Sequence, residues 1–195
     1  MKRFSIFCII LISSLFVFTP LLNAAAPPAE GQTMPDFELP VPKDAAERAY
    51  LGISGRLPVI GGGTFRVPQI RGQAVLFQVF SMYCPHCQKD APNMNAFYSL
   101  VESSPKAKGK VKIIGVGAGN NPYEVSVFKK KYQVPFPLFP DPDYIIHKKV
   151  AEVRTPYFIV LKIMPDGTHR VVYSKLGSFG EPAAFLDSVI KMTGI

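Results

Sequence analysis

Two cysteines separated by two residues form the most reactive arrangement in this sequence. Cys84 and Cys87 lie in the stretch FSMYCPHCQKDAP, residues 80–92, with Pro85 and His86 between them. This spacing occurs in redox-active disulfides, in one half of a zinc site, and in pairs without any chemical role. The elements predicted around the pair help to choose among these uses.

Cys84 is predicted to follow a buried strand directly and to begin a helix. Residues 74–80 are almost continuously apolar, as expected of a central strand covered on both faces. The residues after the pair have helical spacing of apolar side chains: Met94, Phe97, Tyr98 and Val101. A thiol at a helix N-terminus lies among unpaired N–H groups at the positive end of the helix dipole. We therefore expect the pKa of Cys84 to be lowered.

The residues next to Cys84 fit a disulfide that opens and closes. Pro85 is suited to the first helical position, because the N–H that it lacks would be unpaired there. Cys87 lies one turn further on the same helical face, within reach of an unstrained disulfide. We expect an exposed Cys84 to attack and a more buried Cys87 to resolve. A cationic His86 ring near the sulfur would favour the thiolate and make the disulfide a stronger oxidant.

Metal binding is the main alternative use of these residues. A structural zinc site needs four ligands. Outside the first 26 residues, the candidates are two cysteines and three histidines: Cys84, Cys87, His86, His147 and His169. A copper site of Cys84, Cys87 and His147 remains open, since thiolates and imidazole suit that metal, and it would indicate a copper-binding chaperone. A chemically inert pair is the other alternative. We expect no resident metal or cofactor.

The first 26 residues predict export from the cytoplasm. A basic start, Met1 to Arg3, precedes the apolar run from Phe4 to Leu22 and a cluster of small residues at 23–26. The alternative is an uncleaved membrane anchor, because the run approaches the length that a bilayer needs. Without this segment the chain has 20 basic and 14 acidic residues, a net charge of +6. No basic stripe interleaved with aromatic residues appears, so we expect no nucleic-acid partner.

The rest of the chain predicts one mixed α/β unit after an N-terminal extension. Residues 27–63 are rich in Pro and Gly and allow only a short helix at 44–51. From residue 64 to 195, strands and helices alternate. The predicted strands are 74–80, 111–116, 157–164 and 170–174, and the predicted helices follow Cys84, begin at residue 121, and cover 182–192. The last two strands form a hairpin, which gives a mixed sheet with helices on both faces.

Two motifs resemble the thioredoxin superfamily. FSMYCPHC, with Pro92 eight residues after Cys84, resembles its active site. The stretch RTPYF, residues 154–158, resembles the conserved loop of that family, in which the proline is cis. In the family this loop packs beside the cysteines, and its backbone pairs with the substrate chain. The resemblance implies a thioredoxin-like fold and thiol–disulfide exchange. It places Pro156 with the catalytic residues Cys84, Cys87 and His86, and Tyr83, Pro85 and Thr155 with the substrate-binding ones. Tyr83 is either an apolar contact for a substrate loop or a residue that packs beside the site.

Two subfamilies share features with this chain. The CPHC motif resembles DsbA-like thiol oxidases, whereas residues 31–39 and 128–137 resemble exported TlpA/ResA-like thioredoxins. No large helical domain is inserted between the cysteines and Pro156, as the DsbA kind would have. The resemblance implies a periplasmic or otherwise extracytoplasmic protein that exchanges disulfides with protein thiols. A membrane electron donor or acceptor is a further expected partner, and the direction, reductase or oxidase, remains open.

Two positions depart from or add to the family pattern. Gln78 stands where many relatives have a buried acid that moves protons for the resolving cysteine, and an amide cannot do this. An ordinary polar residue of the core is an equal alternative for Gln78. Asp90 matches an acid of ResA-like proteins that could tune the pair or move its proton, although a solvent-facing acid of the first helix is an equal alternative. A peroxiredoxin-type peroxidase is a third function, disfavoured because no Pro-x-x-x-Thr-x-x-Cys pattern includes Cys84.

Overall fold

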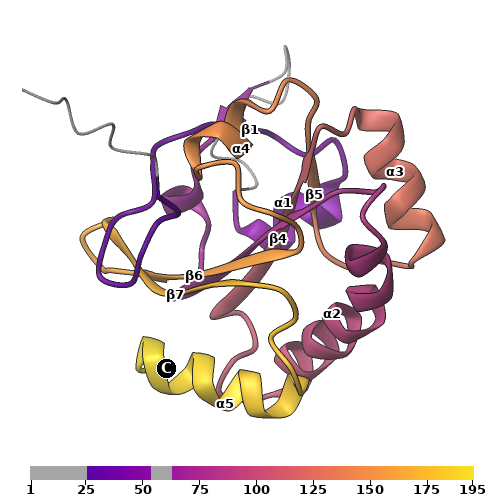
Figure 1. The fold of residues 1–195 in the computed structure, drawn as a ribbon. Helices are drawn as coiled ribbons and strands as arrows, with labels where there is room; N and C mark the ends of the chain where they lie inside the picture. The colour runs from indigo at the N-terminus through magenta and orange to yellow at the C-terminus, as the bar shows by residue number, and fades with distance from the viewer. Residues whose placement is uncertain (1–25, 54–62) are drawn as a thin grey trace, which may run out of the picture.

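A five-stranded mixed sheet forms the centre of the computed structural model, which describes residues 26–53 and 63–195 (Figure 1). The strand order is β5-β4-β3-β6-β7. β3, β4 and β5 are parallel, and β6 and β7 are antiparallel to their neighbours. The strands are β3 (Ala74–Phe80), β4 (Val111–Ala118), β5 (Leu138–Asp141), β6 (Tyr157–Ile163) and β7 (His169–Leu176). A separate short pair consists of β1 (Leu39–Pro40) and β2 (Thr64–Phe65).

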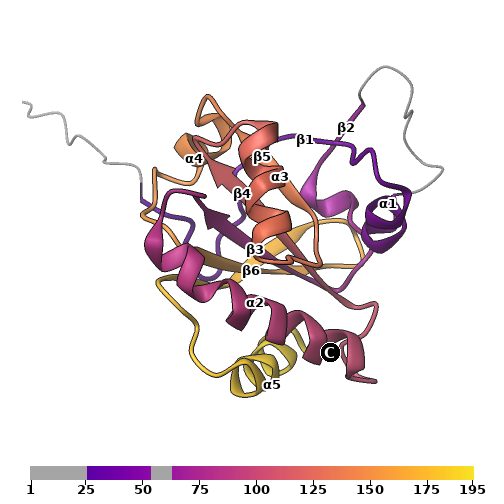
Figure 2. The same cartoon turned by 90° about the vertical axis from the view of Figure 1, so that its right-hand side faces the viewer.

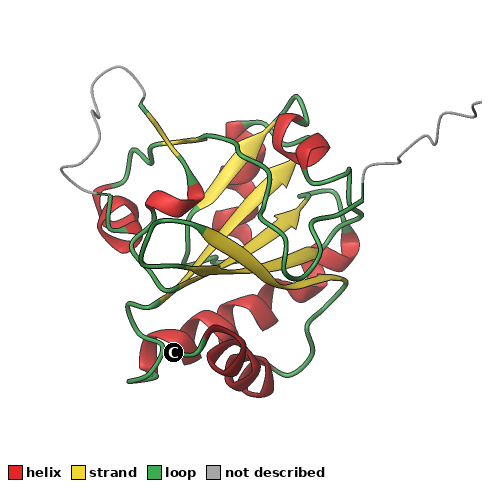
Figure 3. Cartoon of the chain, turned by 90° about the vertical axis from the view of Figure 1, so that its left-hand side faces the viewer, coloured by secondary structure: helices red, strands yellow, loops and turns green. Residues whose placement is uncertain are grey.

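Helices cover both faces of the sheet (Figure 3). They are α1 (Ala45–Leu51), α2 (Pro85–Ser103), α3 (Pro122–Lys131), α4 (Ile145–Lys149) and α5 (Pro182–Thr193), with a 3-10 turn at Val67–Gln69. Figure 2 shows α2 and α5 packed together on the same side of the sheet. The predicted α/β class, with a mixed sheet between helices, is confirmed.

The elements that the sequence predicted are present with small shifts at their ends. The helix at 122–131 begins with the expected capping box, in which Asn121 and Glu124 bind each other's backbone N–H groups. Two elements in the stretch between α3 and β6 were not predicted, β5 and α4. β5 has only four residues and contains Pro140, and α4 has five residues, so neither has enough sequence for a clear periodic pattern.

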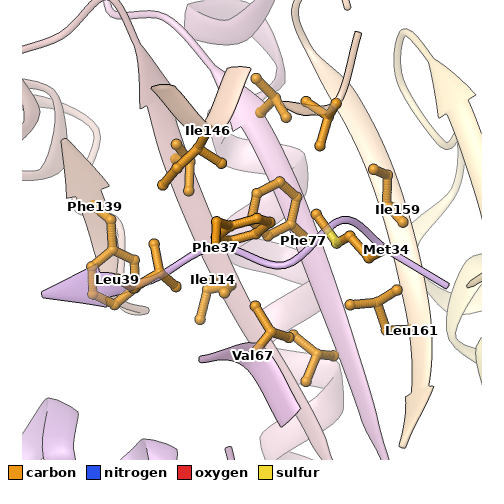
Figure 4. Close-up of a cluster of buried hydrophobic side chains, with 14 of the residues drawn as sticks. Met34, Phe37, Leu39, Val67, Phe77, Ile114, Phe139, Ile146, Ile159 and Leu161 are labelled. Atoms are coloured by element: carbon orange, nitrogen blue, oxygen red, sulfur yellow. The ribbon is translucent and has the colours of Figure 1, made fainter. Parts of the chain in front are cut away.

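Residues 34–53 cover one face of the sheet. Figure 4 shows Phe37 against Phe77 of β3, with Met34 beside Ile159 and Leu161 of β6. The ring centroids of Phe37 and Phe77 are 5.6 Å apart, a favourable tilted pair. The same buried cluster includes Leu39, Leu51 and Ile53. Residues on both sides of the predicted boundary at residue 63 therefore share one core.

The opposite face is covered mainly by α2 and α5. The stripe predicted for α2 is buried at Met94, Phe97 and Val101, while Tyr98 is partly buried against the same cluster. Phe97 meets Phe185 of α5 at a centroid distance of 5.2 Å. Since α2 is held along its length by this packing, its N-terminus has a fixed position at the end of β3.

Some predictions concern residues that are not described. Residues 1–25, nearly all of the predicted signal segment, and Gly61 and Gly62 of the glycine triplet lie outside the described residues. Within residues 26–53 and 63–195, no helix is both long and apolar enough to cross a membrane.

Candidate active site

A short loop joins the buried strand β3 to α2 and positions the cysteines. All seven residues of β3 are buried, and Cys84 is the N-cap of α2, with Pro85 at the start of the helix as predicted. The loop is held by its backbone at Met82. The Met82 N–H donates to Oδ1 of Asn120 at 2.8 Å, and the Gln88 side chain donates to the Met82 carbonyl at 2.7 Å. Cys84 therefore follows a loop that is fixed from two sides.

The two sulfurs have different surroundings. Cys84 is partly exposed and Cys87 is fully buried, at 0% exposure. Both are free thiols, so the structure has the reduced form of the pair. This is the asymmetry expected of an attacking and a resolving cysteine.

Hydrogen bonds lower the pKa of Cys84 despite its partial burial. Burial has the largest single effect and raises the pKa, but several donors together outweigh it. They are the Thr155 side chain, the Cys87 backbone N–H and thiol, and the His86 backbone N–H. The Thr155 carbonyl oxygen, 3.3 Å from the Cys84 sulfur, accepts a bond only from the protonated thiol. The net result is a thiol that ionises more readily than usual.

Burial has the opposite effect on the second cysteine. Removal from solvent raises the pKa of Cys87 to about 12, and the hydrogen bond and negative charge of Cys84 also act to raise it. Cys87 therefore remains a protonated donor while Cys84 is the thiolate. The two shifts agree, because the same S–H···S⁻ bond lowers the pKa of Cys84 and raises that of Cys87.

The loop before β6 lies against the cysteines. The Thr155–Pro156 peptide bond is cis, as the resemblance implied. The Pro156 carbonyl accepts a hydrogen bond from the N–H of Gly177 at 2.9 Å, which joins this loop to the end of β7. On its other side, Nε2 of His147 is 2.8 Å from the Val153 carbonyl. The loop is thus held from β7 and from α4.

A cleft of about 570 Å³ opens between the start of α2 and this loop. Its lining residues come from α2, from residues 154–156 and from the end of β7: His86, Lys89, Asp90, Arg154, Thr155, Pro156, Leu176, Gly177 and Ser178. The His86 side chain is exposed in this cleft. His86 acts on the Cys84 sulfur through its backbone N–H, whereas the sequence pattern had suggested an effect of its imidazole.

Asp90 is the buried acid of the site. It is 8% exposed, lies three residues after Cys87 on α2, and lines the cleft. Its Oδ1 accepts a long 3.4 Å hydrogen bond from Asn93, and its buried Oδ2 has no partner among the described residues. Asp90 is therefore not the solvent-facing acid that the sequence left as an alternative.

Two other predicted residues have clear positions. Gln78 is 3% exposed in β3, and strand alternation places it with Leu76 and Phe80 on the face covered by α2. Tyr83 is 64% exposed, and its hydroxyl donates a short hydrogen bond to Glu124. Tyr83 is therefore available to a partner instead of packed within the chain.

The surroundings of the pair do not form a metal centre. Within the described part of the chain, no three His, Cys, Asp or Glu side chains are grouped so that they could hold a metal ion. His147, the third ligand of the copper alternative, has its Nε2 at the Val153 carbonyl. The geometry of these residues gives no support to a copper site.

Several residues of the site were not predicted from the sequence. Asn120 is fully buried and binds the active-site loop, but it lies 36 residues after Cys84, in a turn whose position only the packed sheet defines. Lys89, Arg154 and Ser178 line the cleft. Lys89 and Arg154 lie within the two quoted stretches, residues 80–92 and 154–158, and that position in the sequence was the available signal.

Comparisons with known proteins find a family profile and related sequences. The profile of the AhpC/TSA family matches residues 31–172. The thiol-disulfide oxidoreductase ResA of Geobacillus kaustophilus (strain HTA426) is 24% identical over 125 residues, which are 64% of this chain and 59% of the relative. The chain thus spans about three fifths of the length of that curated relative.

Solved structures share the fold. A candidate thiol:disulfide interchange protein DsbE from Chlorobium tepidum has a TM-score of 0.61 and 16% identity, with 86% of this chain and 99% of that chain covered. The thioredoxin domain of a thiol-disulfide oxidoreductase from Bacteroides vulgatus has a TM-score of 0.57 and 16% identity, with coverage of 83% and 98%. The expected thioredoxin-like fold is confirmed.

Proposed function

The chain belongs to the AhpC/TSA family, and on that premise we propose that it is a thiol–disulfide oxidoreductase that acts on protein partners through Cys84 and Cys87. The observation that supports this most strongly is the difference between the two thiols. Cys84 is accessible and has a lowered pKa, and Cys87 is buried one turn away with its pKa raised to about 12. Reactive and resolving thiols need these properties.

In the reducing direction, the Cys84 thiolate attacks one sulfur of a client disulfide. An S–S bond forms between Cys84 and the client, and the other client sulfur leaves as a thiolate that takes up a proton. Cys87 then loses its proton and attacks the Cys84 sulfur, which releases the second client thiol and leaves the Cys84–Cys87 disulfide. Two electrons pass from the pair to the client, and the reverse sequence oxidises a client dithiol.

Loss of the Cys87 proton is the difficult step, because burial disfavours the Cys87 thiolate. We assign Asp90 as the group that accepts or relays this proton. Its carboxyl is buried on the same helix, one turn from Cys87, and one oxygen lacks a protein partner in the described residues. Gln78, buried on the same side of the sheet, cannot ionise and so cannot take this role.

The reduction potential determines the direction of electron flow. A lowered pKa of Cys84 stabilises the reduced pair, and for two electrons about 1.4 kcal/mol corresponds to about 30 mV. Equilibration with glutathione buffers measures this potential. A value near that of thioredoxin, about −270 mV, indicates a reductase recharged by a membrane electron donor. A value near that of DsbA, about −120 mV, indicates an oxidase.

The proposal includes an extracytoplasmic location. Residues 1–26 have the pattern of a signal segment, followed by residues 27–63 and the thioredoxin-like part, 64–195. A periplasmic protein with two cysteines can cycle between dithiol and disulfide in contact with exported clients. N-terminal sequencing of the protein from an envelope fraction tests cleavage. A retained Met1 would favour the anchor instead.

The direct test of the activity is turnover of a protein disulfide in the presence of a small thiol reductant. The purified chain should accelerate the reaction, and Cys84→Ser should reduce the rate to that of the uncatalysed reaction. The matched control is Ser188→Ala, which removes one exposed hydroxyl of α5, outside the cleft lining, and keeps both cysteines. Full activity of Cys84→Ser would overturn the proposal.

A further inference from the structure

The cleft beside Cys84 has exposed positive charge. Lys89 and Arg154 are both exposed on its lining, and His86 lies there too. Among the described residues, neither Lys89 nor Arg154 forms an ion pair; the ion pairs found involve Arg66 and Lys129. Two cationic side chains in one cleft, without a partner in the described chain, are available to an anionic ligand.

The acidic groups near the cleft do not neutralise this charge. Asp90 is the one carboxyl in the lining, and it is buried with its Oδ2 away from solvent. Glu152 lines a second hollow and not the cleft, and the two share Arg154 and Thr155. The solvent-facing charge of the cleft is therefore positive.

The remaining lining fits a peptide segment. Leu176 is 38% exposed and offers an apolar contact, and Ser178 and Thr155 offer hydroxyl groups. Ser178 of the lining is held in place by Asn93, whose amide is 3.3 Å from the Ser178 hydroxyl and donates to the nearby Gly180 carbonyl at 3.1 Å. A volume of about 570 Å³ is in the usual range of ligand pockets.

We propose that this cleft selects clients with acidic residues beside their reactive cysteine, which Lys89 and Arg154 bind while Cys84 exchanges disulfides with that cysteine. The proposal rests on the proposed exchange activity and names the substrate class of the same site. Opposite charges across an interface act mainly on the encounter rate and on partner choice. The effect should therefore appear as a salt-dependent rate preference.

The experiment measures how fast thiol peptides reduce the oxidised protein. Three peptides share one sequence with two cysteines and differ only in flanking residues, which are Asp, Ser or Lys. Each rate is divided by the rate of the same peptide with an uncharged small disulfide, which removes differences in thiol reactivity. At low salt we expect the Asp peptide to react about tenfold faster than the Lys peptide, with a ratio that approaches one at high salt.

A matched pair of variants locates the effect. Lys89→Glu with Arg154→Glu should abolish or invert the preference. Lys106→Glu with Lys108→Glu changes the net charge by the same amount, at exposed positions beyond the C-terminal end of α2. This second variant should keep the preference for the Asp peptide. Because the readout is a ratio between peptides, a change in the intrinsic reactivity of Cys84 does not affect it. The change of this ratio with salt is measured on the unaltered protein, so that part of the test does not depend on how a variant folds.

Three results would overturn the proposal. One is an Asp-to-Lys ratio near one at low salt, and another is an equal loss of preference in both charge variants. The third is a preference for glutathione over an uncharged thiol without any preference for the Asp peptide, which would assign the cleft to a small anionic thiol. Failure of dithiothreitol to reduce the oxidised pair would be a different outcome, since it would contradict the exchange activity itself.

Discussion

At the scale of single residues, the reactivity of Cys84 depends on hydrogen bonds to its sulfur. Thr155→Val removes the hydroxyl that stabilises the thiolate and keeps the shape of the side chain. Since the lowered pKa then rises, the rate of Cys84 alkylation should reach half of its maximum at a higher pH than in the unaltered protein. Iodoacetamide labelling across pH, followed by mass spectrometry, measures this.

Thr155→Ser is the matched control, because it keeps the hydroxyl donor. Its alkylation profile should remain close to that of the unaltered protein. Identical profiles for the Val and Ser variants would contradict the role given to the Thr155 side chain. Cys87, with a pKa of about 12, should stay unlabelled at neutral pH in all three proteins.

A second residue-scale prediction concerns Asp90. Asp90→Asn keeps the volume but cannot accept a proton, so the attack by Cys87 on the mixed disulfide should slow by about a hundredfold, the lower range for general base catalysis. Alkylation of Cys84 should change much less. Reactions quenched at successive times give the lifetime of the mixed disulfide, which reports the attack by Cys87. Alkylation reports the reactivity of Cys84 separately.

Asp90→Glu restores the carboxyl and should recover part of the rate. A mixed disulfide with the same lifetime in Asp90→Asn and in the unaltered protein would remove Asp90 from the mechanism. In that case its buried carboxyl would be only a polar group of the cleft.

At the scale of elements, the turn after β4 supports the loop that precedes α2. Asn120→Ala leaves the Met82 N–H without its acceptor, which should lower the free energy of unfolding by about 1–3 kcal/mol. Amide hydrogen exchange at Met82 should become faster, because its N–H no longer donates to the turn that holds it from a distant part of the sequence. Urea unfolding and exchange measurements test both effects.

Tyr123→Ala provides the control for this turn. Tyr123 is 75% exposed, so its loss should change the free energy of unfolding by less than about 0.5 kcal/mol. Unchanged exchange at Met82 in Asn120→Ala would show that the loop does not depend on this hydrogen bond.

At the scale of the whole molecule, residues 34–53 are part of the core. A chain that begins at residue 64 lacks five buried apolar side chains: Met34, Phe37, Leu39, Leu51 and Ile53. Each contributes about 1.5–3 kcal/mol on burial, so the total loss is comparable with the whole stability of a typical domain. We expect this shorter chain not to unfold cooperatively in urea, whereas a chain that begins at residue 26 should. Cooperative unfolding of the shorter chain would contradict this expectation.

Sequence patterns predicted the parts of the fold in which local signals agree. β3 has a continuous apolar run, α3 has a complete capping box, and α2 has a regular apolar stripe. The packing of residues 26–53 on the sheet was not predicted, because Pro-rich segments lack periodicity and their burial depends on contacts with distant strands. Residues 27–63 were therefore described as an extension.

The site residues that lie within a recognised sequence motif were predictable. Cys84, Cys87 and Pro156 follow from the CPHC and RTPYF motifs, and the cis bond at Pro156 was expected. The burial of Asp90 and the contact of Asn120 with Met82 were not predictable, since both depend on how the helix and the turn pack in three dimensions. The source of the lowered pKa of Cys84 required the same information, because Thr155 is 71 residues away in sequence.

The most direct test of the exchange mechanism is to trap the mixed disulfide. The Cys87→Ser and Cys84→Ser variants are each mixed with a client protein that contains a disulfide, quenched with acid and examined by mass spectrometry. We expect a stable adduct through Cys84 in Cys87→Ser, because the resolving thiol is absent, and no adduct in Cys84→Ser, because Cys87 is buried and protonated. An adduct through Cys87, or none in Cys87→Ser, would contradict the mechanism.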